Sequence, residues 1–366
     1  MTPTERDDAC AAAAGALRRP PSPDAPTLVA GFDGFIDRVI DVVSERTSPD
    51  AYSRVPTLAS LGARISDAAG RSANLELVVK DTKPGGNGAI LAAAAGALGA
   101  RTVFVGTIGA GAPDPLFAPL SAGANRAVAI APPGKTEALE FDDGKLLLGE
   151  PATLRAVTWD AVAPTLAEAV PCALLAMGNW TMTPDMTDIW RRLASDILPG
   201  AACAGVFIDL ADPAKRTDND LRDALDAMRA MDAHAPLTLG LNVAEGERLA
   251  GLLGIQSSAT DLAAAAAALR ERTGLSAVAL HTRPAAALAT SDGAWAIDGP
   301  FLRHPAATTG AGDHFNAGVC VGAALGLAPP ARLALGVGCS GLFVRTGRSP
   351  ERGALAGFLE DLPAPE

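Results

Sequence analysis

The 366-residue sequence contains few cysteines and no closely spaced pair of them. The five cysteines are Cys10, Cys172, Cys203, Cys320 and Cys339. An odd number of scattered cysteines fits neither a disulfide framework nor a zinc site. The sequence therefore predicts a protein of the reducing cytoplasm.

Positive charge is also scarce, since 30 Lys and Arg face 41 Asp and Glu, for a formal net charge of −11. Nucleic acids and anionic membrane surfaces attract basic proteins, so neither is expected as the main partner. A compact anionic ligand stays possible, because the N-terminus of a helix can bind it against the global charge.

The sequence has no unbroken hydrophobic segment of membrane-spanning length. Residues 318–344 are apolar, but Pro329-Pro330 and Arg332 divide them, and two buried helices are the better interpretation. With 49% hydrophobic residues, the chain can bury the core of one large domain.

The N-terminal 26 residues are rich in Ala and Pro. Basic residues follow the apolar stretch 11–17 instead of preceding it, which is the reverse of a secretory signal. We interpret residues 1–26 as a loose leader or a short packed helix, and residues 27–366 as the main domain.

Short apolar segments alternate with helical ones along the chain. This pattern predicts a mostly parallel sheet covered by helices on both faces. Ligands bind such sheets at the carboxyl ends of the strands. The expected strands are residues 27–32, 101–106, 172–177, 204–210, 237–242 and 276–281, and the expected helices include 88–99, 186–198 and 261–274.

Two segments do not fit this rhythm. Residues 135–149 read as a hairpin around Asp143-Gly144, and residues 73–82 alternate in polarity as well. We assign both to a small β-sheet beside the main domain. Such a sheet would serve as a lid or as a dimer surface.

The stretch TTGAGDHFNAG begins where a small-residue helix begins. Thr308 or Thr309 could cap that helix, and Asp313 suits the positive end of its dipole. Alternatively, Gly310, Ala311 and Gly312 lack side chains so that backbone N–H groups can hold an anion beside the carboxylate.

Four further segments carry polar groups near expected strand ends. In GFDGFID, Asp33 and Asp37 would point the same way on an extended strand and could bind the hydroxyls of a polyol, unless one of them caps a turn. In KPGGNGA, the glycines allow close backbone approach, although a plain turn is equally possible. In MGNWTM, Asn179 could contact the same ligand, and Trp180 could stack on a sugar or pack in the core.

The last of these segments is LNVAEGE. Asn242 and Glu245 could orient the waters of a magnesium ion. A capping box at the start of a helix is the alternative, and it is preferred when this segment is taken alone.

The order GxxxxxD, GGN, NxxE and TTGAGD over residues 27 to 350 resembles the ribokinase-like (PfkB) family of sugar and nucleoside kinases. The resemblance implies a three-layer α/β fold with a mostly parallel central sheet and a small β-sheet lid. It further implies a kinase that uses ATP and Mg²⁺.

The resemblance also implies roles for individual residues. Asp313 is the catalytic base, and the backbone N–H groups of Gly310, Ala311 and Gly312 bind the transferring phosphoryl group. Asn242 and Glu245 organise magnesium, through water, and the phosphates. The acceptor side comprises Asp33, Asp37, Gly85, Gly86, Asn87 and Asn179, and the nucleotide side further includes His281, Thr309 and Gly336.

The sequence departs from the family pattern at three places. Ala307 stands where the family signature usually begins with an aspartate. That aspartate contributes a ligand to a monovalent-cation site in many relatives, so potassium dependence is doubtful here. One extra residue lies between Gly31 and Asp37. His281 and Pro284 replace a glycine-bearing turn over the nucleotide, and His281 could be only a satisfied loop histidine.

The expected activity is transfer of the γ-phosphoryl group of ATP to a hydroxyl of a sugar or related polyol. A nucleoside kinase and a non-catalytic sensor on the same fold are the alternatives. Lys83 and Arg38 flank the acceptor segments and could meet a phosphorylated sugar, but a neutral acceptor is preferred. A homodimer is expected.

Overall fold

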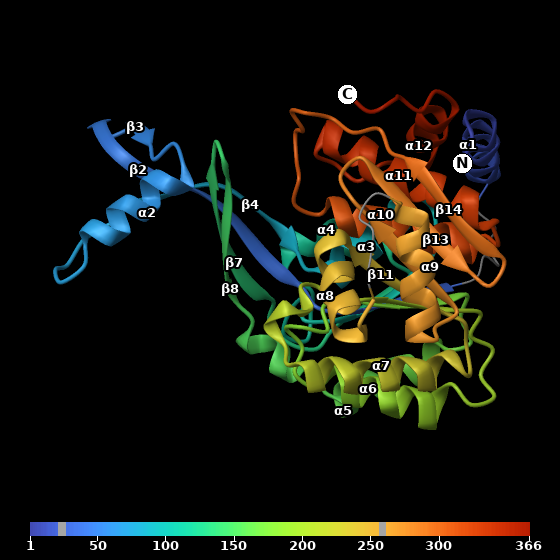
Figure 1. Cartoon of the computed structure of the whole chain (residues 1–366). Coiled ribbons are helices and arrows are strands. Elements are labelled where there is room, and N and C mark those ends of the chain that lie inside the picture. The colour runs from blue at the N-terminus through green and yellow to red at the C-terminus, as the bar shows by residue number, and fades with distance from the viewer. Residues whose placement is uncertain (21–26, 256–260) are drawn as a thin grey trace.

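The computed structural model describes residues 1–20, 27–255 and 261–366, and a nine-stranded sheet forms its centre (Figure 1). The strand order is β14-β13-β12-β11-β10-β9-β1-β5-β6, and all neighbours are parallel except β12–β13 and β13–β14. The strands are β1 Thr27–Phe32, β5 Arg101–Gly106, β6 Arg126–Ala129, β9 Leu174–Met177, β10 Val206–Asp209, β11 Leu237–Asn242, β12 Ala277–His281, β13 Ala285–Thr290 and β14 Gly293–Asp298.

Helices cover both faces of this sheet, because its strands are apolar on both sides. One core cluster joins the sheet to α5 Trp159–Ala169, α6 Met186–Arg192, α7 Asp218–Asp232, α8 Val243–Leu253 and α9 Leu262–Thr273. The other joins it to α1 Pro3–Arg18, α3 Asn87–Ala97, α4 Ala118–Gly123, α10 Ala311–Ala324, α11 Pro329–Thr346 and α12 Arg352–Glu360. Short helical turns lie at η1 Pro115–Phe117, η2 Ala152–Ala156, η3 Leu193–Ile197 and η4 Pro213–Lys215.

The N-terminal segment is a packed helix over Pro3–Arg18 and not a loose leader. Thr2 and Glu5 form a capping box at its start, and Ala13 and Leu17 are buried against the main domain. Arg352 donates to the backbone oxygens of Leu17 (2.7 Å) and of other residues at the helix end. Residues 21–26 of the expected leader lie outside the described residues.

A second, five-stranded sheet projects from the main body (Figure 1). Its strand order is β3-β2-β7-β8, with β4 paired to β2, and we call this sheet together with α2 the lid. The elements are β2 Phe35–Ser48, β3 Ala51–Arg54, α2 Leu58–Asp67, β4 Leu77–Gly85, β7 Gly134–Phe141 and β8 Gly144–Glu150.

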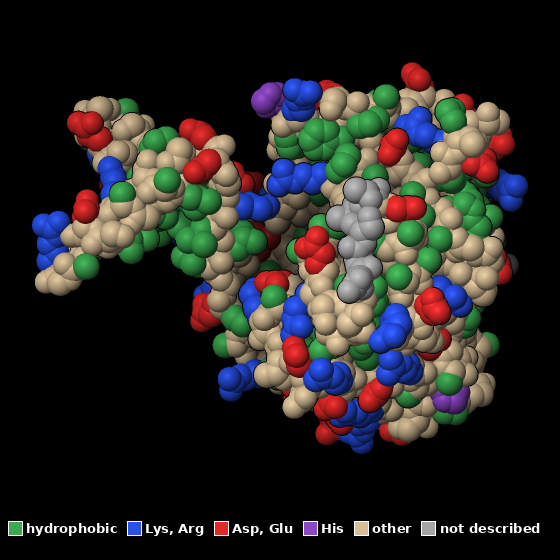
Figure 2. Space-filling view, in the orientation of Figure 1, with side chains coloured by type: hydrophobic (Ala, Val, Ile, Leu, Met, Phe, Trp, Pro, Cys, Tyr) green, Lys and Arg blue, Asp and Glu red, His purple; other side chains and the backbone are tan. Residues whose placement is uncertain are grey.

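The two faces of the lid differ in chemistry. Directly paired residues share a face, so Asp37, Thr136 and Lys83 lie together on one face. Pairing of Leu139 with Leu146 and with Ile40 places those residues on the opposite face, where α2 covers part of the surface. Hydrophobic side chains gather visibly on the lid (Figure 2), and the exposed ones include Leu77, Val79, Leu146, Leu147 and Leu148.

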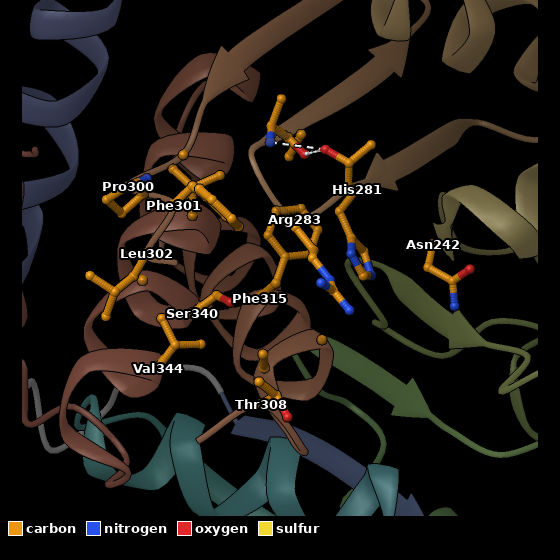
Figure 3. A pocket seen from close by; sticks show the side chains of 18 of the residues that line it. Asn242, His281, Arg283, Pro300, Phe301, Leu302, Thr308, Phe315, Ser340 and Val344 are labelled. Carbon is orange, nitrogen blue, oxygen red and sulfur yellow. Dashed lines mark hydrogen bonds between the residues drawn. The ribbon is translucent and has the colours of Figure 1, made fainter. Parts of the chain in front are cut away.

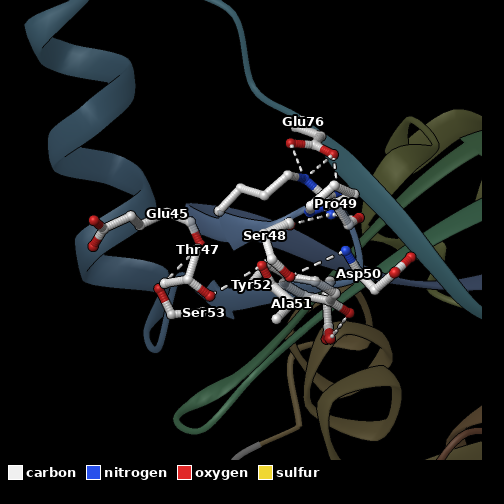
Figure 4. Close-up of polar contacts among 11 residues, drawn as sticks. Glu45, Thr47, Ser48, Pro49, Asp50, Ala51, Tyr52, Ser53 and Glu76 are labelled. Carbon is white, nitrogen blue, oxygen red and sulfur yellow. Dashed lines mark hydrogen bonds and ion pairs between the residues drawn. The ribbon is translucent and has the colours of Figure 1, made fainter.

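Polar contacts fix the far end of the lid, where β2 turns into β3 (Figure 4). Arg46 is paired with Glu76, and it donates to the backbone oxygen of Pro49 (2.5 Å). The hydroxyl of Tyr52 donates to Asp41 Oδ2 at 2.9 Å. These contacts tie the turn to the chain that leads into β4.

The α/β architecture with a small additional sheet is confirmed, including the hairpin and the two helices expected in residues 318–344. The sequence interpretation missed β2 and β3, because β2 follows β1 after only two residues. It also missed β6 and the antiparallel pair β13–β14. None of the helices in the described parts of the chain is long and apolar enough to cross a membrane.

Candidate active site

Polar side chains from four neighbouring strands meet at one edge of the large sheet. Asp33, Asn179 and Asn242 lie at or just beyond the carboxyl ends of β1, β9 and β11, and Asp209 ends β10. Because these strands are parallel and adjacent, their ends meet on one side. The starts of α3 and α10 reach the same region, since Asn87 lies within hydrogen-bond distance of both Asp33 and Asp313.

The start of α10 is built for close approach to its backbone. Gly310 is the N-cap with φ of 94°, a left-handed conformation that glycine adopts without strain. Helix geometry leaves the first N–H groups without an intrahelical carbonyl partner. Ala311 and Gly312 follow and line a cavity, so little side-chain bulk stands between these amides and a ligand. The arrangement can hold an anion.

Asp313 lies in the first turn of α10 and is 9% exposed. The side-chain amide of Asn87 donates to Asp313 Oδ1 at 2.9 Å. Burial raises the pKa of Asp313 to about 7, and the nearby carboxylate of Asp33 adds to the shift. A carboxylate with a pKa near neutrality suits a general base.

Asp33 does not share a strand with Asp37, and that prediction was wrong. β1 ends at Phe32, and β2 begins at Phe35 in the lid. Asp33, in the connection, is fully buried and accepts hydrogen bonds from the backbone N–H groups of Asn87 (2.8 Å) and Gly88 (2.7 Å). Its carboxylate therefore caps the first N–H groups of α3, whereas the alternative weighed for this segment was the cap of a turn.

Asp37 lies in β2, on the face of the lid that carries Lys83 and Thr136. Burial raises the pKa of the Asp37 carboxyl, and a hydrogen bond from Thr136 opposes the shift. A Cβ at Gly85 would lie 2.4 Å from Asp37 Oδ2, so a larger residue there would displace the Asp37 carboxylate. Gly86 has φ of 97° and begins α3, and its own Cβ would lie 2.8 Å from the backbone oxygen of Asp33.

Asn179 supports this cluster from the end of β9. Its side-chain amide donates to Asp33 Oδ2 at 2.9 Å, and its backbone has φ of 60°. Trp180 is fully buried, and its indole N–H donates to Thr187 Oγ1 at 2.8 Å. Of the two roles considered for Trp180, the structure therefore shows core packing.

Asn242 and Glu245 form the capping box that begins α8. Asn242 Oδ1 accepts from the backbone N–H of Glu245 (3.0 Å), and Glu245 Oε2 accepts from that of Asn242 (2.8 Å). Glu245 Oε1 also accepts from the backbone N–H of Asp212 at 2.9 Å. Burial raises the pKa of the Glu245 carboxyl.

Asp209 and Asn316 are site residues that the sequence interpretation missed. The amide of Asn316, one turn after Asp313, donates to Asp209 Oδ2 at 2.6 Å. Burial raises the pKa of Asp209 well above its usual value, and the charges of Glu245 and Asp313 raise it further. The sequence does contain a signal for Asp209, because this carboxylate ends an apolar strand in the same way that Asp33 follows one.

A cavity of about 630 Å³ opens beside the start of α10 (Figure 3). Asn242 and His281 line it from the strand ends, Phe301 and Leu302 from the loop after β14, and Val344 from α11. Its mixture of apolar walls and a few polar groups is typical of a ligand cavity. The start of α10 lies at its edge, which places the anion-binding amides in reach of a bound ligand.

His281 is half-buried in this cavity, with its ring centroid 4.9 Å from that of Phe315. Desolvation lowers the pKa of His281 to about 4, so the ring is neutral at pH 7. Gly336 does not line the cavity. It lies at the crossing of α10 and α11, where a Cβ would approach Phe315 to 2.8 Å, and the adjacent Val337 faces the cavity instead.

Thr308 lines this cavity, whereas Thr309 lines a second one of about 510 Å³. The second cavity is lined by residues of α3 and also by Asp37 and Lys83. Thr309, which the sequence analysis assigns to the nucleotide side, therefore lines a different cavity from Asn242 and His281. The two threonines mark the boundary between the cavities.

Within the described ranges, no group of three or more His, Cys, Asp and Glu side chains is arranged to hold a metal ion. A hydrated Mg²⁺ does not need such a group, because it contacts the protein largely through its waters. Asn316 Oδ1 is buried beside Asp209 and has no hydrogen-bond partner among the described residues. The donor set around Asp209 and Glu245 thus fits a hydrated ion.

The family model of prokaryotic ketohexokinase matches residues 5–362 of the chain. The chain belongs to the prokaryotic ketohexokinase family. A ketohexokinase of Haloferax volcanii is 33% identical over 347 residues, which cover 92% of this chain and 91% of that protein. The protein is a carbohydrate kinase.

Solved structures with the same fold are ribokinase-like kinases, as the sequence motifs predict. A ribokinase of Thermotoga maritima superposes with a TM-score of 0.62 and 17% identity, covering 91% of this kinase and 98% of that chain. A carbohydrate kinase of Agrobacterium tumefaciens superposes with a TM-score of 0.63 and 16% identity, covering 93% of this kinase and 98% of that chain. At such identities the likeness concerns the fold, and the resemblance to the PfkB family is confirmed.

Proposed function

We propose that this kinase transfers the γ-phosphoryl group of ATP to a hydroxyl of a ketohexose. The observation that carries the proposal is the 33% identity to a ketohexokinase along nearly the whole chain. The buried carboxylate of Asp313 at the start of α10 supports it, because phosphoryl transfer to an alcohol needs a base near the acceptor.

In the proposed reaction, Asp313 accepts the proton of the acceptor hydroxyl while that oxygen attacks the γ-phosphorus. A new oxygen–phosphorus bond forms, and the bond to the β-phosphate oxygen breaks to release ADP. The amides of residues 310–312 stabilise the negative charge of the transferring group. Asn87 holds the Asp313 carboxylate in place through its 2.9 Å hydrogen bond.

We assign the remaining site residues to three tasks. Asp37, Asn87 and the glycines Gly85 and Gly86 form the acceptor side. Asp33 holds Asn87 in position by accepting its backbone N–H, and Asn179 holds Asp33 by donating to its carboxylate. Asn242 and His281 border the nucleotide. Asp209 and Glu245 would hold a hydrated Mg²⁺, which neutralises phosphate charge when bound. A cytoplasmic location stays a prediction.

The test is an ADP-release assay of the purified protein over ketohexoses, aldohexoses, pentoses, sugar phosphates and nucleosides. A ketohexose is expected to give a kcat/KM at least tenfold above that of any other class. A nucleoside as best acceptor would support the alternative of a nucleoside kinase. Ligand binding without turnover on any of them would contradict the proposed reaction.

We propose that potassium stimulates this kinase little. Ala307 offers a methyl group where relatives are expected to carry an aspartate ligand. The start of α10 is instead held by His314, whose Nδ1 donates to the backbone oxygen of Gly310 (2.7 Å) and whose Nε2 lies 2.9 Å from Ser349 Oγ. Turnover in potassium should match turnover in a bulky organic cation at equal ionic strength. More than tenfold activation by potassium would overturn this assignment.

We propose that two copies of the chain pair through the lid face that carries Leu146 and Leu148. Burying exposed apolar side chains of a sheet against a second copy of the chain removes them from water and so stabilises the pair. Light scattering at micromolar concentration should give a dimer mass for the wild type and a monomer mass for Leu148→Asp.

The matched control for the dimer is Leu147→Asp. Leu147 and Leu148 are 49% and 51% exposed and adjacent, but they lie on opposite faces of β8. Leu147→Asp should therefore stay dimeric. A monomeric wild type, or equal dissociation of the two variants, would count against the proposed interface.

A further inference from the structure

Two cysteines that the proposed reaction does not use lie side by side at the amino ends of two neighbouring strands. Cys172 precedes β9 and Cys203 precedes β10, and the two residues form an isolated parallel bridge. Their sulfur atoms are 3.5 Å apart. The residues are 31 positions apart in the sequence, so the sheet is what brings them together.

The backbone on either side of the pair fixes this arrangement. The N–H of Cys172 donates to the backbone oxygen of Ala202 at 3.1 Å, and the N–H of Ala204 donates to the backbone oxygen of Cys172 at 3.1 Å. Neighbouring strands lie about 4.8 Å apart, and a disulfide joins Cα atoms roughly 4.4–6.8 Å apart. Rotation of the two side chains can therefore bring the sulfur atoms to bonding distance without movement of the strands.

The two thiols act on each other's protonation. The hydrogen bond between them lowers the pKa of the Cys203 thiol and raises the pKa of the Cys172 thiol. In its protonated form, Cys203 donates to the backbone oxygen of Gly205 at 3.2 Å. The thiolate is the form that reacts with oxidants, so Cys203 is the nucleophile of the pair and Cys172 is the second thiol beside it.

The pair lies just below the surface of the protein. The side chains of Cys172 and Cys203 are buried, but the neighbouring residues Pro171, Ala202 and Ala204 are exposed. A small oxidant such as hydrogen peroxide therefore has a short path to the sulfur atoms.

The other three cysteines have different surroundings. Cys10, Cys320 and Cys339 lie in α1, α10 and α11, and burial raises the pKa of each of these thiols. In the parts of the chain that the structure describes, no hydrogen bond joins any of them to another cysteine. They lack both the neighbouring sulfur and the lowered pKa that the Cys172–Cys203 pair has.

We propose that Cys172 and Cys203 are a modification site, at which a peroxide converts the two thiols into a reversible disulfide. The Cys203 thiolate attacks one peroxide oxygen, the oxygen–oxygen bond breaks, and Cys203 becomes a sulfenic acid while hydroxide leaves. The sulfur of Cys172 then attacks the sulfur of Cys203, so that the sulfur–sulfur bond forms and the sulfur–oxygen bond breaks. The hydroxyl group leaves as water with the proton of Cys172. In total the thiols lose two electrons and two protons, and hydrogen peroxide is reduced to two molecules of water.

The disulfide would form far from the candidate active site. Asn179 and Asp209 lie at or beyond the opposite ends of the same two strands, roughly 20 Å away at about 3.3 Å per residue. The new bond closes the segment that contains β9 and α6, and such a cross-link restricts the unfolded chain. Oxidation is therefore expected to stabilise the fold and to leave turnover unchanged.

The first test counts thiols in the full-length protein. Reduced wild type, Cys172→Ala, Cys203→Ala and the control Cys10→Ala are treated with hydrogen peroxide, unfolded and alkylated. The wild type and Cys10→Ala should each lose two alkylatable thiols, with Cys172 joined to Cys203 by peptide mass spectrometry, and dithiothreitol should restore both. Cys172→Ala should form no such bond, and its Cys203 should be trapped as a sulfenic acid by dimedone.

Thermal unfolding and turnover measure the consequence of the bond. The oxidised wild type should melt at least about 3 °C above the reduced protein, and dithiothreitol should reverse the shift. Cys172→Ala should melt at the same temperature with and without peroxide, which controls for oxidation elsewhere in the chain. The kcat of the oxidised wild type should stay within twofold of the reduced one.

Three results would count against the proposal. Full alkylation of Cys172 and Cys203, after a peroxide treatment that oxidises glutathione in the same solution, would overturn the site itself. A disulfide between any other two cysteines would also overturn it. A fall in kcat that dithiothreitol reverses, and that Cys172→Ala does not show, would contradict the purely stabilising role.

Discussion

Asp313→Asn is expected to remove nearly all turnover and leave the fold intact. The amide keeps the shape of the side chain, and its oxygen can still accept the 2.9 Å hydrogen bond from Asn87. It cannot take a proton from the acceptor. A positioned base contributes at least about 10²-fold to the rate, so the purified variant should retain less than about a hundredth of the wild-type kcat. Retention of more than about a tenth would remove Asp313 from the role of base.

The same variant should be more stable than the wild type above neutral pH. The pKa of Asp313 is raised to about 7 in the folded protein and lies near its ordinary value in the unfolded chain. Ionisation therefore opposes folding, fully above pH 7 and not at all below about pH 4, where the carboxyl is protonated in both states. Denaturation at pH 8 should show a gain of about 1–4 kcal/mol that shrinks as the pH falls.

The Asp313 experiment has a control variant and a second measurement on the wild type. Asp292→Asn, in the exposed turn between β13 and β14, should change neither turnover nor the pH dependence of stability. In the wild type, kcat should fall as the pH is lowered through about 7, because the protonated carboxyl no longer accepts a proton. A profile that is flat between pH 6 and 8 would place the base elsewhere.

The parts of the site that the sequence predicted are those whose interactions are local. Gly310 and Asp313 are three residues apart, and so are Asn242 and Glu245, so helix geometry alone sets their relation. The sheet followed equally from short-range apolar patterns. These patterns also predict that ligands bind at the carboxyl ends of the strands.

The missed features depend on contacts between distant segments. Asp33 was placed wrongly because two residues separate β1 from β2, and nothing local reveals that the chain passes from one sheet to another there. Cys172 and Cys203 come together only because β9 and β10 are neighbours in the sheet. Asp209 ends an apolar strand in the sequence, but only the pairing of β10 with β9 and β11 brings the ends of those strands, with Asn179 and Asn242, beside it.

Gly310→Ala is expected to lower kcat at least thirtyfold at a modest cost in stability. The N-cap glycine has φ of 94°, where an alanine is strained by roughly 1–2 kcal/mol. A Cβ there would lie 3.5 Å from Phe343 Cζ and 3.6 Å from Ile90 Cδ1, so packing tolerates it. Relief of the strain rotates the backbone that aims the amides of Ala311 and Gly312. Misplacing one such donor typically costs on the order of 10²–10³ in rate.

The matched control is Gly326→Ala, beyond the other end of α10. Gly326 has φ of 68° and open space around its Cβ position, so the substitution imposes a similar backbone strain away from the phosphate. Both variants should lose roughly 1–2 kcal/mol of unfolding free energy, measured by denaturant titration, and only Gly310→Ala should lose turnover. If the two variants lost activity equally, the effect would follow stability, and the start of α10 would not be the place where the phosphoryl group is held.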